Sequence, residues 1–210
     1  MRTVKEPEIR KREILDTAEK LFFTKGYEET TINDILEAVK IAKGTFYYYF
    51  KSKEDVLDGI VKRQIDAGLE KAQAIAADPQ LGAEEKLLSV IMAQKLKKPA
   101  KKNILPIIHK PANALLHQKI ISEYVLRLSP ILTDIVQEGI AKKDFNTPYP
   151  KEITEILLTA GLVIFDTAYF RWTQEEQMRR ISAFIYTMER LTGAKSGSMA
   201  QLSGMFTINH

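Results

Sequence analysis

Apolar residues recur at helical spacing in a short segment near the start of the chain. Between Ile32 and Val39 they stand at i, i+3, i+4 and i+7, the pattern of a helix that buries one face. Thr31 precedes this segment, and Asp34 follows three residues later, which is a capping-box arrangement. The pattern therefore predicts a helix whose start is well marked.

A second short helix is predicted directly after a tight turn. It is expected to begin near Ala42 and to hold Phe46 and Phe50 four residues apart on one face. Two short helices joined by a tight turn form a helix-turn-helix. We expect Phe46 to point inward and the polar residues of the second helix to point outward.

Longer helices are predicted on both sides of this pair. Segment 8–25 has apolar residues at helical spacing and stops at Gly26, a favoured residue just past a helix end. Ser52, with Asp55 three residues later, opens a helix predicted over 52–77. Such a helix is long enough to run from the helix-turn-helix into the rest of the protein. The first three helices are expected to form one module.

The rest of the chain also has helical periodicity, so we expect an all-α fold. Pro130 is expected to kink one of these helices, and the stretch after Gly193 has no period and is expected to be a flexible tail. The predicted domains are 1–51 (helix-turn-helix), 52–192 (helical body) and 193–210 (tail). The helical patterns of the body after residue 82 cover 82–96, 104–108, 112–139, 151–171 and 174–191.

The outward residues of the second short helix have the chemistry of a DNA-reading surface. Lys43 can reach a guanine edge or a phosphate, Thr45 can meet a base edge or a thymine methyl, and tyrosine hydroxyls can donate to phosphates. Gly44 removes a side chain where a duplex would approach. Ordinary half-buried packing stays an open alternative for each tyrosine. The candidate DNA-binding residues are Thr31, Lys43, Gly44, Thr45, Tyr47, Tyr48, Tyr49 and Lys53, the last at a helix start that favours a phosphate.

These residues also carry a resemblance to a known family. The sequence resembles the DNA-binding domain of TetR-family transcriptional repressors over about its first third. The family usually has glycine where Lys40 stands and a small hydroxyl residue where Ala42 stands, so the chain departs from the pattern at the turn. The resemblance rests on Gly26-Tyr27, Thr30-Thr31-Ile32, Asp34-Ile35, Ala38, Ile41 to Phe50 and Ser52-Lys53-Glu54.

Composition narrows the class of protein without deciding it. The 210 residues are 45% hydrophobic, which is enough for a substantial core, and the net charge of +4 permits nucleic-acid binding. The chain has no cysteine, its first residues do not form a signal peptide, and its longest apolar run, 156–165, is too short to span a bilayer. His109 and His117 are not accompanied by residues at metal-ligand spacing. We expect a cytoplasmic protein without a cofactor or a metal.

The resemblance implies a ligand-responsive, sequence-specific repressor that binds a palindromic DNA operator as a homodimer. The helical body would dimerise and would bind an unidentified small-molecule effector. Two other classes remain. One is a DNA-binding architectural or cell-cycle protein of the same fold without an effector. The other is an enzyme, which the sequence does not favour because it contains no catalytic motif. The candidate effector-pocket residues, which also fit ordinary core packing, are Tyr124, Phe145, Phe165, Asp166, Tyr169, Phe170 and Trp172.

Overall fold

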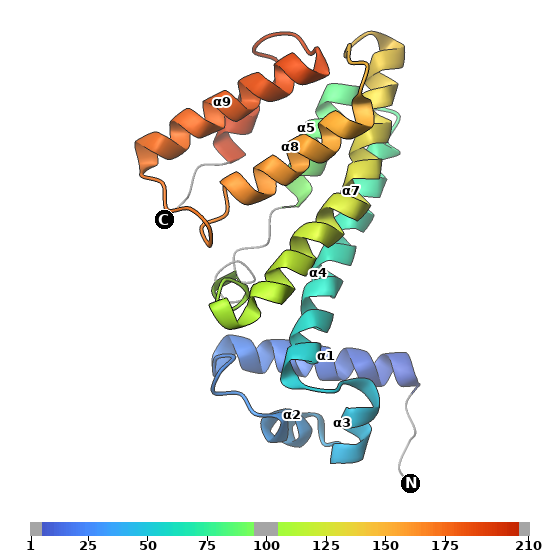
Figure 1. The fold of residues 1–210 in the computed structure, drawn as a ribbon. Helices are drawn as coiled ribbons and strands as arrows, with labels where there is room; N and C mark the ends of the chain where they lie inside the picture. Colours follow the sequence, from blue (N-terminus) through green and yellow to red (C-terminus); the bar gives the residue numbers. More distant parts are fainter. Residues whose placement is uncertain (1–5, 95–104, 206–210) are drawn as a thin grey trace. The chain divides into compact units, whose positions relative to one another are not determined.

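The computed structural model describes residues 6–94 and 105–205, and every regular element within them is a helix, as expected (Figure 1). A short helical turn over 105–108 precedes the 3₁₀ turn η1. The elements are α1 Pro7–Thr24, α2 Ile32–Val39, α3 Lys43–Tyr49, α4 Lys53–Ala76, α5 Ala83–Ala93, η1 Pro111–Asn113, α7 Ala114–Lys142, α8 Pro150–Ile164, α9 Gln174–Thr192 and η2 Ala200–Met205.

The chain forms two compact units. The first comprises 1–66 and 96–116, and the second comprises 67–95 and 117–210. Helices α4 and α7 each contribute residues to both units.

The first unit is built around the three N-terminal helices. Ile14 and Ala18 of α1, Ile35 of α2 and Phe46 of α3 have no solvent-exposed surface and form its core. Arg63 of α4 donates hydrogen bonds to two acidic residues of α1, Asp16 at 2.5 Å and Glu19. Helix α4 is thereby fastened to α1 by charge as well as by apolar packing.

The second unit contains α5, α8, α9, η2 and most of α7. Its fully buried side chains include Val90 of α5, Leu128 and Ile135 of α7, and Ile181 of α9. Helix α7 continues through Pro130 as one helix, although a proline removes one backbone donor. Helices α8 and α9 pack against each other in this unit (Figure 1).

The structure differs from the sequence expectation at the end of α8 and in the segment after Gly193. Helix α8 ends at Ile164 rather than near Arg171, because Trp172 Nε1 donates to the carbonyl oxygen of Ile164 at 3.0 Å and the chain turns at Asp166. The segment after Gly193 was expected to be flexible, but its described part packs onto α9. Met199 and Leu202 in this segment are buried.

Candidate nucleic-acid interface

Helix α2 begins with the predicted capping box. Thr31 Oγ1 accepts from the backbone N–H of Asp34 at 3.1 Å, and the Asp34 carboxylate accepts from the backbone N–H of Thr31 at 2.7 Å. Lys25 also donates to this carboxylate at 2.7 Å. These hydrogen bonds stabilise the charged form, so they lower the pKa of Asp34 to about 2. The start of α2 is therefore held by the reciprocal hydrogen bonds of Thr31 and Asp34 and by the ion pair with Lys25.

The turn between α2 and α3 adopts a left-handed backbone at Lys40. Its φ is 59° and its ψ is 50°. Glycine adopts this conformation readily, whereas a lysine does so at a cost of about 1 kcal/mol. The turn is closed by the backbone N–H of Ile41, which donates to the carbonyl oxygen of Leu36 at 3.1 Å. Ala42 then starts α3 without a side-chain cap. The chain keeps the turn geometry despite both departures from the family pattern.

Helix α3 divides its residues into an inner and an outer set. Phe46 and Phe50 are buried, and they hold the helix against the module. Tyr47 and Tyr48 are exposed, with 45% and 77% of their surfaces open to solvent. Thr45 and Tyr49 are half-buried, while Lys43 and Gly44 are exposed.

Gly44 has no packing role among the residues that the structure describes. A Cβ added there would meet no atom within 4 Å. The glycine is therefore not required by the fold, which fits the prediction that a bound molecule approaches the backbone at this point.

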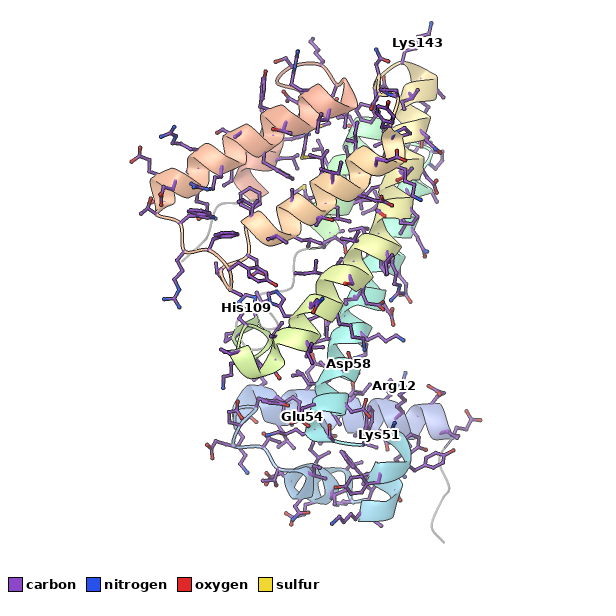
Figure 2. All side chains as sticks on the ribbon, viewed as in Figure 1. Arg12, Lys51, Glu54, Asp58, His109 and Lys143 are labelled. Carbon is purple, nitrogen blue, oxygen red and sulfur yellow. The ribbon has the colours of Figure 1, made fainter. Side chains whose placement is uncertain are left out.

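The start of α4 holds the loop between α1 and α2. Lys53 Nζ donates to the carbonyl oxygens of Tyr27, at 2.8 Å, and Glu28, at 3.3 Å. The Tyr27 hydroxyl donates to Glu54 at 3.4 Å, and burial together with this carboxylate raises the pKa of Tyr27. Figure 2 labels Lys51 and Glu54, which mark the start of α4. Sequence reasoning assigned Lys53 to phosphate alone and missed this bracing role.

In the second unit, five of the candidate effector residues lie between the end of α8 and the start of α9, and four of them follow Phe165: Asp166, Tyr169, Phe170 and Trp172. Asp166 lies 2.7 Å from His117 Nε2, and Tyr169 stacks on His117 with 5.1 Å between ring centroids. Phe170 stacks on Trp172 at 5.0 Å, and the guanidinium of Arg180 lies 3.4 Å from the Trp172 ring centroid. His117 and Arg180 were not among the sequence candidates.

The other three candidates have different surroundings. Phe165 makes an edge-on contact with Phe184 of α9 at 5.5 Å. Phe145 is buried against Gly139, where an added Cβ would lie 2.3 Å from the Phe145 ring. Tyr124 is half-buried, and burial raises the pKa of its hydroxyl. Phe145 is thus a packing residue. Asp166 and Tyr169 share the partner His117, and Phe170 and Trp172 stack on each other.

None of the described helices is both long and apolar enough to cross a membrane.

Comparison with known proteins identifies both parts of the chain. Residues 14–60 match the family model of bacterial regulatory proteins of the tetR family, and residues 97–187 match that of a tetracyclin repressor-like C-terminal domain. Together these matches cover more than half of the chain. The family consists of transcriptional regulators, not of enzymes.

Individual relatives agree with the family models. The HTH-type transcriptional regulator EthR of Mycolicibacterium smegmatis is 41% identical over 76 residues, which are 34% of this chain and 35% of EthR. The chain thus aligns with only about a third of that relative. The fatty acid metabolism regulator protein of Bacillus subtilis is 26% identical over 67% of this chain and 75% of its own.

A solved structure extends the likeness over nearly the whole chain. The structure of a TetR/AcrR-family transcriptional regulator from Thermobifida fusca has a TM-score of 0.58 and 27% identity, and it covers 89% of this chain and 99% of its own. The match therefore includes both the helix-turn-helix and the helical body. The resemblance seen in the sequence is confirmed: the chain belongs to the TetR family of bacterial transcriptional regulators.

Proposed function

We propose that the protein is a ligand-responsive transcriptional repressor that binds a palindromic DNA operator as a homodimer in the cytoplasm. The observation that carries this proposal is the division of α3. Phe46 and Phe50 are buried and anchor the helix, while Lys43, Gly44 and Tyr48 are exposed. A short helix presented in this way enters a major groove, with its first residues at base edges.

Dimerisation is supported by exposed residues of α8 and α9. Ile156 is 61% exposed, and Thr159 and Ala160, which lie three and four residues further along, are exposed on the same side of the helix. On α9, Tyr186 is 61% exposed. Large apolar side chains that are exposed on a single chain in this way are the kind that a partner surface covers. A second copy would also double the number of bases read, which one short helix reads too sparsely.

For the effector, we propose the cluster around the α8–α9 loop as the first region to examine. Asp166 and its partner His117 supply polar groups, and Phe170 and Trp172 supply flat apolar surface. The Bacillus subtilis relative is named for fatty acid metabolism, so compounds of that metabolism are the first effectors to test.

Operator selection tests the proposal directly. Purified protein is incubated with a random-sequence duplex pool, and bound duplexes are recovered and sequenced over several rounds. We expect an inverted repeat, protected over two half-sites, and a sedimentation coefficient for two protein chains on one duplex. Recovery of duplexes without a common sequence would contradict a specific repressor.

Effector addition separates a repressor from an architectural protein of the same fold. The selected duplex is titrated with protein in the presence of each candidate compound. Release of the duplex with the compound recovered unchanged supports an effector-controlled repressor. Specific binding that no compound alters would favour an architectural or cell-cycle role.

A further inference from the structure

The first unit is made of two stretches of the chain that are separated in sequence by part of the second unit. Residues 67–95 belong to the second unit, whereas the described residues 105–116 belong to the unit that contains α1, α2 and α3. Helix α7 begins here at Ala114 and continues to Lys142, so most of it lies in the second unit. We call residues 105–113 the α7 leader. Like α4, the leader and α7 form a continuous chain connection between the units.

The α7 leader makes a charged contact with the loop between α1 and α2. Lys110 Nζ lies 2.8 Å from the Glu28 carboxylate, which is 82 residues away in sequence. This hydrogen bond is the main reason why the pKa of Glu28 is lowered. The contact therefore joins a segment beside α7 to the helix-turn-helix module.

The leader is braced, so Lys110 is not on a freely moving loop. Ile107 and Ile108 are buried, and Asn113 Nδ2 donates to the carbonyl oxygen of Ile107 at 2.8 Å. An exposed ion pair is weak when both side chains must be ordered to make it. Because the backbone of the leader is already held, only the two side chains remain to be ordered when the pair forms.

The loop on the other side of the pair leads into the operator-facing helices. Thr30 is fully buried, its hydroxyl donates to the carbonyl oxygen of Gly26 at 2.7 Å, and Thr31 is the N-cap of α2. Lys53 holds the carbonyl oxygen of Glu28, while Lys110 holds its side chain. A displacement of Glu28 would therefore be passed to the start of α2.

We propose that Lys110 is a positioning residue for operator binding, whose ion pair with Glu28 couples the α7 leader to the loop that sets the start of α2. This inference rests on the proposed function. It gives a route, through α7 and its leader, by which a change in the helical body alters operator affinity. Lys110 acts through Glu28 and needs no contact with DNA of its own.

A double-mutant cycle tests this role. Glu28→Gln, Lys110→Met, their combination and the exchanged pair Glu28→Lys with Lys110→Glu are titrated against the selected operator and a scrambled duplex, at several salt concentrations. Glu29→Gln is the matched control, because Glu29 is an exposed neighbour in the same loop and loses the same charge. Thermal melting shows that each variant is folded.

Positioning and simple charge attraction give different results. A change in net charge alone alters binding to both duplexes equally and adds up across the cycle. We expect instead that each single change lowers the preference for the operator by about threefold, that the combination lowers it no further, and that the exchanged pair restores it. Glu29→Gln should leave the preference unchanged.

Three outcomes would overturn the inference. Additive effects across the cycle, or an exchanged pair that stays impaired while the wild type selects an operator, would refute the positioning role alone. Failure of the wild type to prefer any duplex would refute the proposed function, and the inference with it.

Discussion

Lys53 Nζ donates to the backbone carbonyl oxygen of Tyr27 at 2.8 Å and lies 4.4 Å from the centroid of the same residue's ring. The start of α4 is therefore tied to the loop that precedes α2. The carbonyl oxygens of Tyr27 and Glu28 that accept from this ammonium are neutral, while its charge also acts on the Glu28 and Glu54 carboxylates and helps to lower their pKa values. Lys53 can brace the loop and still attract a phosphate at the helix start.

Replacing Lys53 by Met separates these two roles. Loss of its hydrogen bonds should lower the free energy of unfolding by about 1 kcal/mol, measured by urea denaturation without DNA. Loss of its charge should reduce the slope of log affinity against log salt by about 0.9, if one phosphate contact is lost. Lys51→Met is the control, because Lys51 is an exposed neighbour with the same charge, and its stability should not change. Equal stability losses in the two variants would contradict the bracing role.

Replacing Ile156 by Glu should dissociate the dimer. Ile156 is 61% exposed in the single chain, so the charge disturbs a partner surface rather than the fold. Sedimentation equilibrium should show that the dissociation constant of the dimer rises at least about tenfold, which corresponds to about 1.4 kcal/mol. Operator affinity should fall in parallel.

The choice of position matters for that experiment. Leu126→Glu, on α7 and 72% exposed, is the control and should leave the dimer intact. Gly161 and Ile185 are unsuitable, although their helices carry the predicted interface. A Cβ at Gly161 would lie 3.1 Å from Phe184 of the same chain, and Ile185 is buried. A dimer that survives Ile156→Glu would place the interface elsewhere.

Replacing Lys25 by Met should raise the pKa of Asp34 from about 2 towards its ordinary value of 3.8, because the Lys25 hydrogen bond is the largest cause of the shift. Carboxyl NMR shifts during acid titration measure this directly. The folded state binds this proton more weakly than the unfolded state does. The stabilisation from Asp34 is therefore fully present above pH 3.8 and is lost as the pH falls towards 2. Lys20→Met, an exposed change on α1, should leave the titration unaltered.

The local features of the helix-turn-helix were predictable from sequence. The capping box at Thr31 and Asp34 and the inward faces of α1 to α3 depend on residues a few positions apart. The left-handed turn at Lys40 was not predictable from the sequence, because a lysine stands where the family usually has glycine and does not favour that conformation.

Features that depend on distant residues were missed. The early end of α8 depends on Trp172 Nε1 reaching back to Ile164, although the apolar pattern continues beyond that residue. The contact between His117 and Asp166 joins residues 49 positions apart on different elements. No periodicity or motif marks such pairs, since they form only when the helices pack.

Replacing Glu189 by Ala should release the C-terminal segment from α9. The buried carboxylate accepts the backbone N–H groups of Gly197, at 2.9 Å, and Met199, at 3.0 Å. Without it these donors lose their partner, and the free energy of unfolding should fall by about 2 kcal/mol. Trypsin should then cleave after Lys195 faster than in the wild type. Glu175→Ala, an exposed change on α9, should alter stability by less than about 0.5 kcal/mol, and an equally resistant Glu189→Ala chain would show that the carboxylate does not hold the segment.

Replacing Thr45 by Ala should relax operator specificity without changing the salt dependence. Thr45 is half-buried in the first turn of α3, next to exposed Lys43 and Gly44, where an entering helix meets base edges. Its side chain carries no charge, so its loss releases no counterion. Selection with the variant should lose preference at one or two operator positions, at about 1–3 kcal/mol for a specific contact. Thr24→Ala is the control, because the Thr24 hydroxyl donates to the backbone carbonyl oxygen of Lys20 within α1. A Thr45→Ala protein that keeps its full preference but changes its salt slope would mean that this face of α3 meets the phosphate backbone, and that base reading lies with other residues.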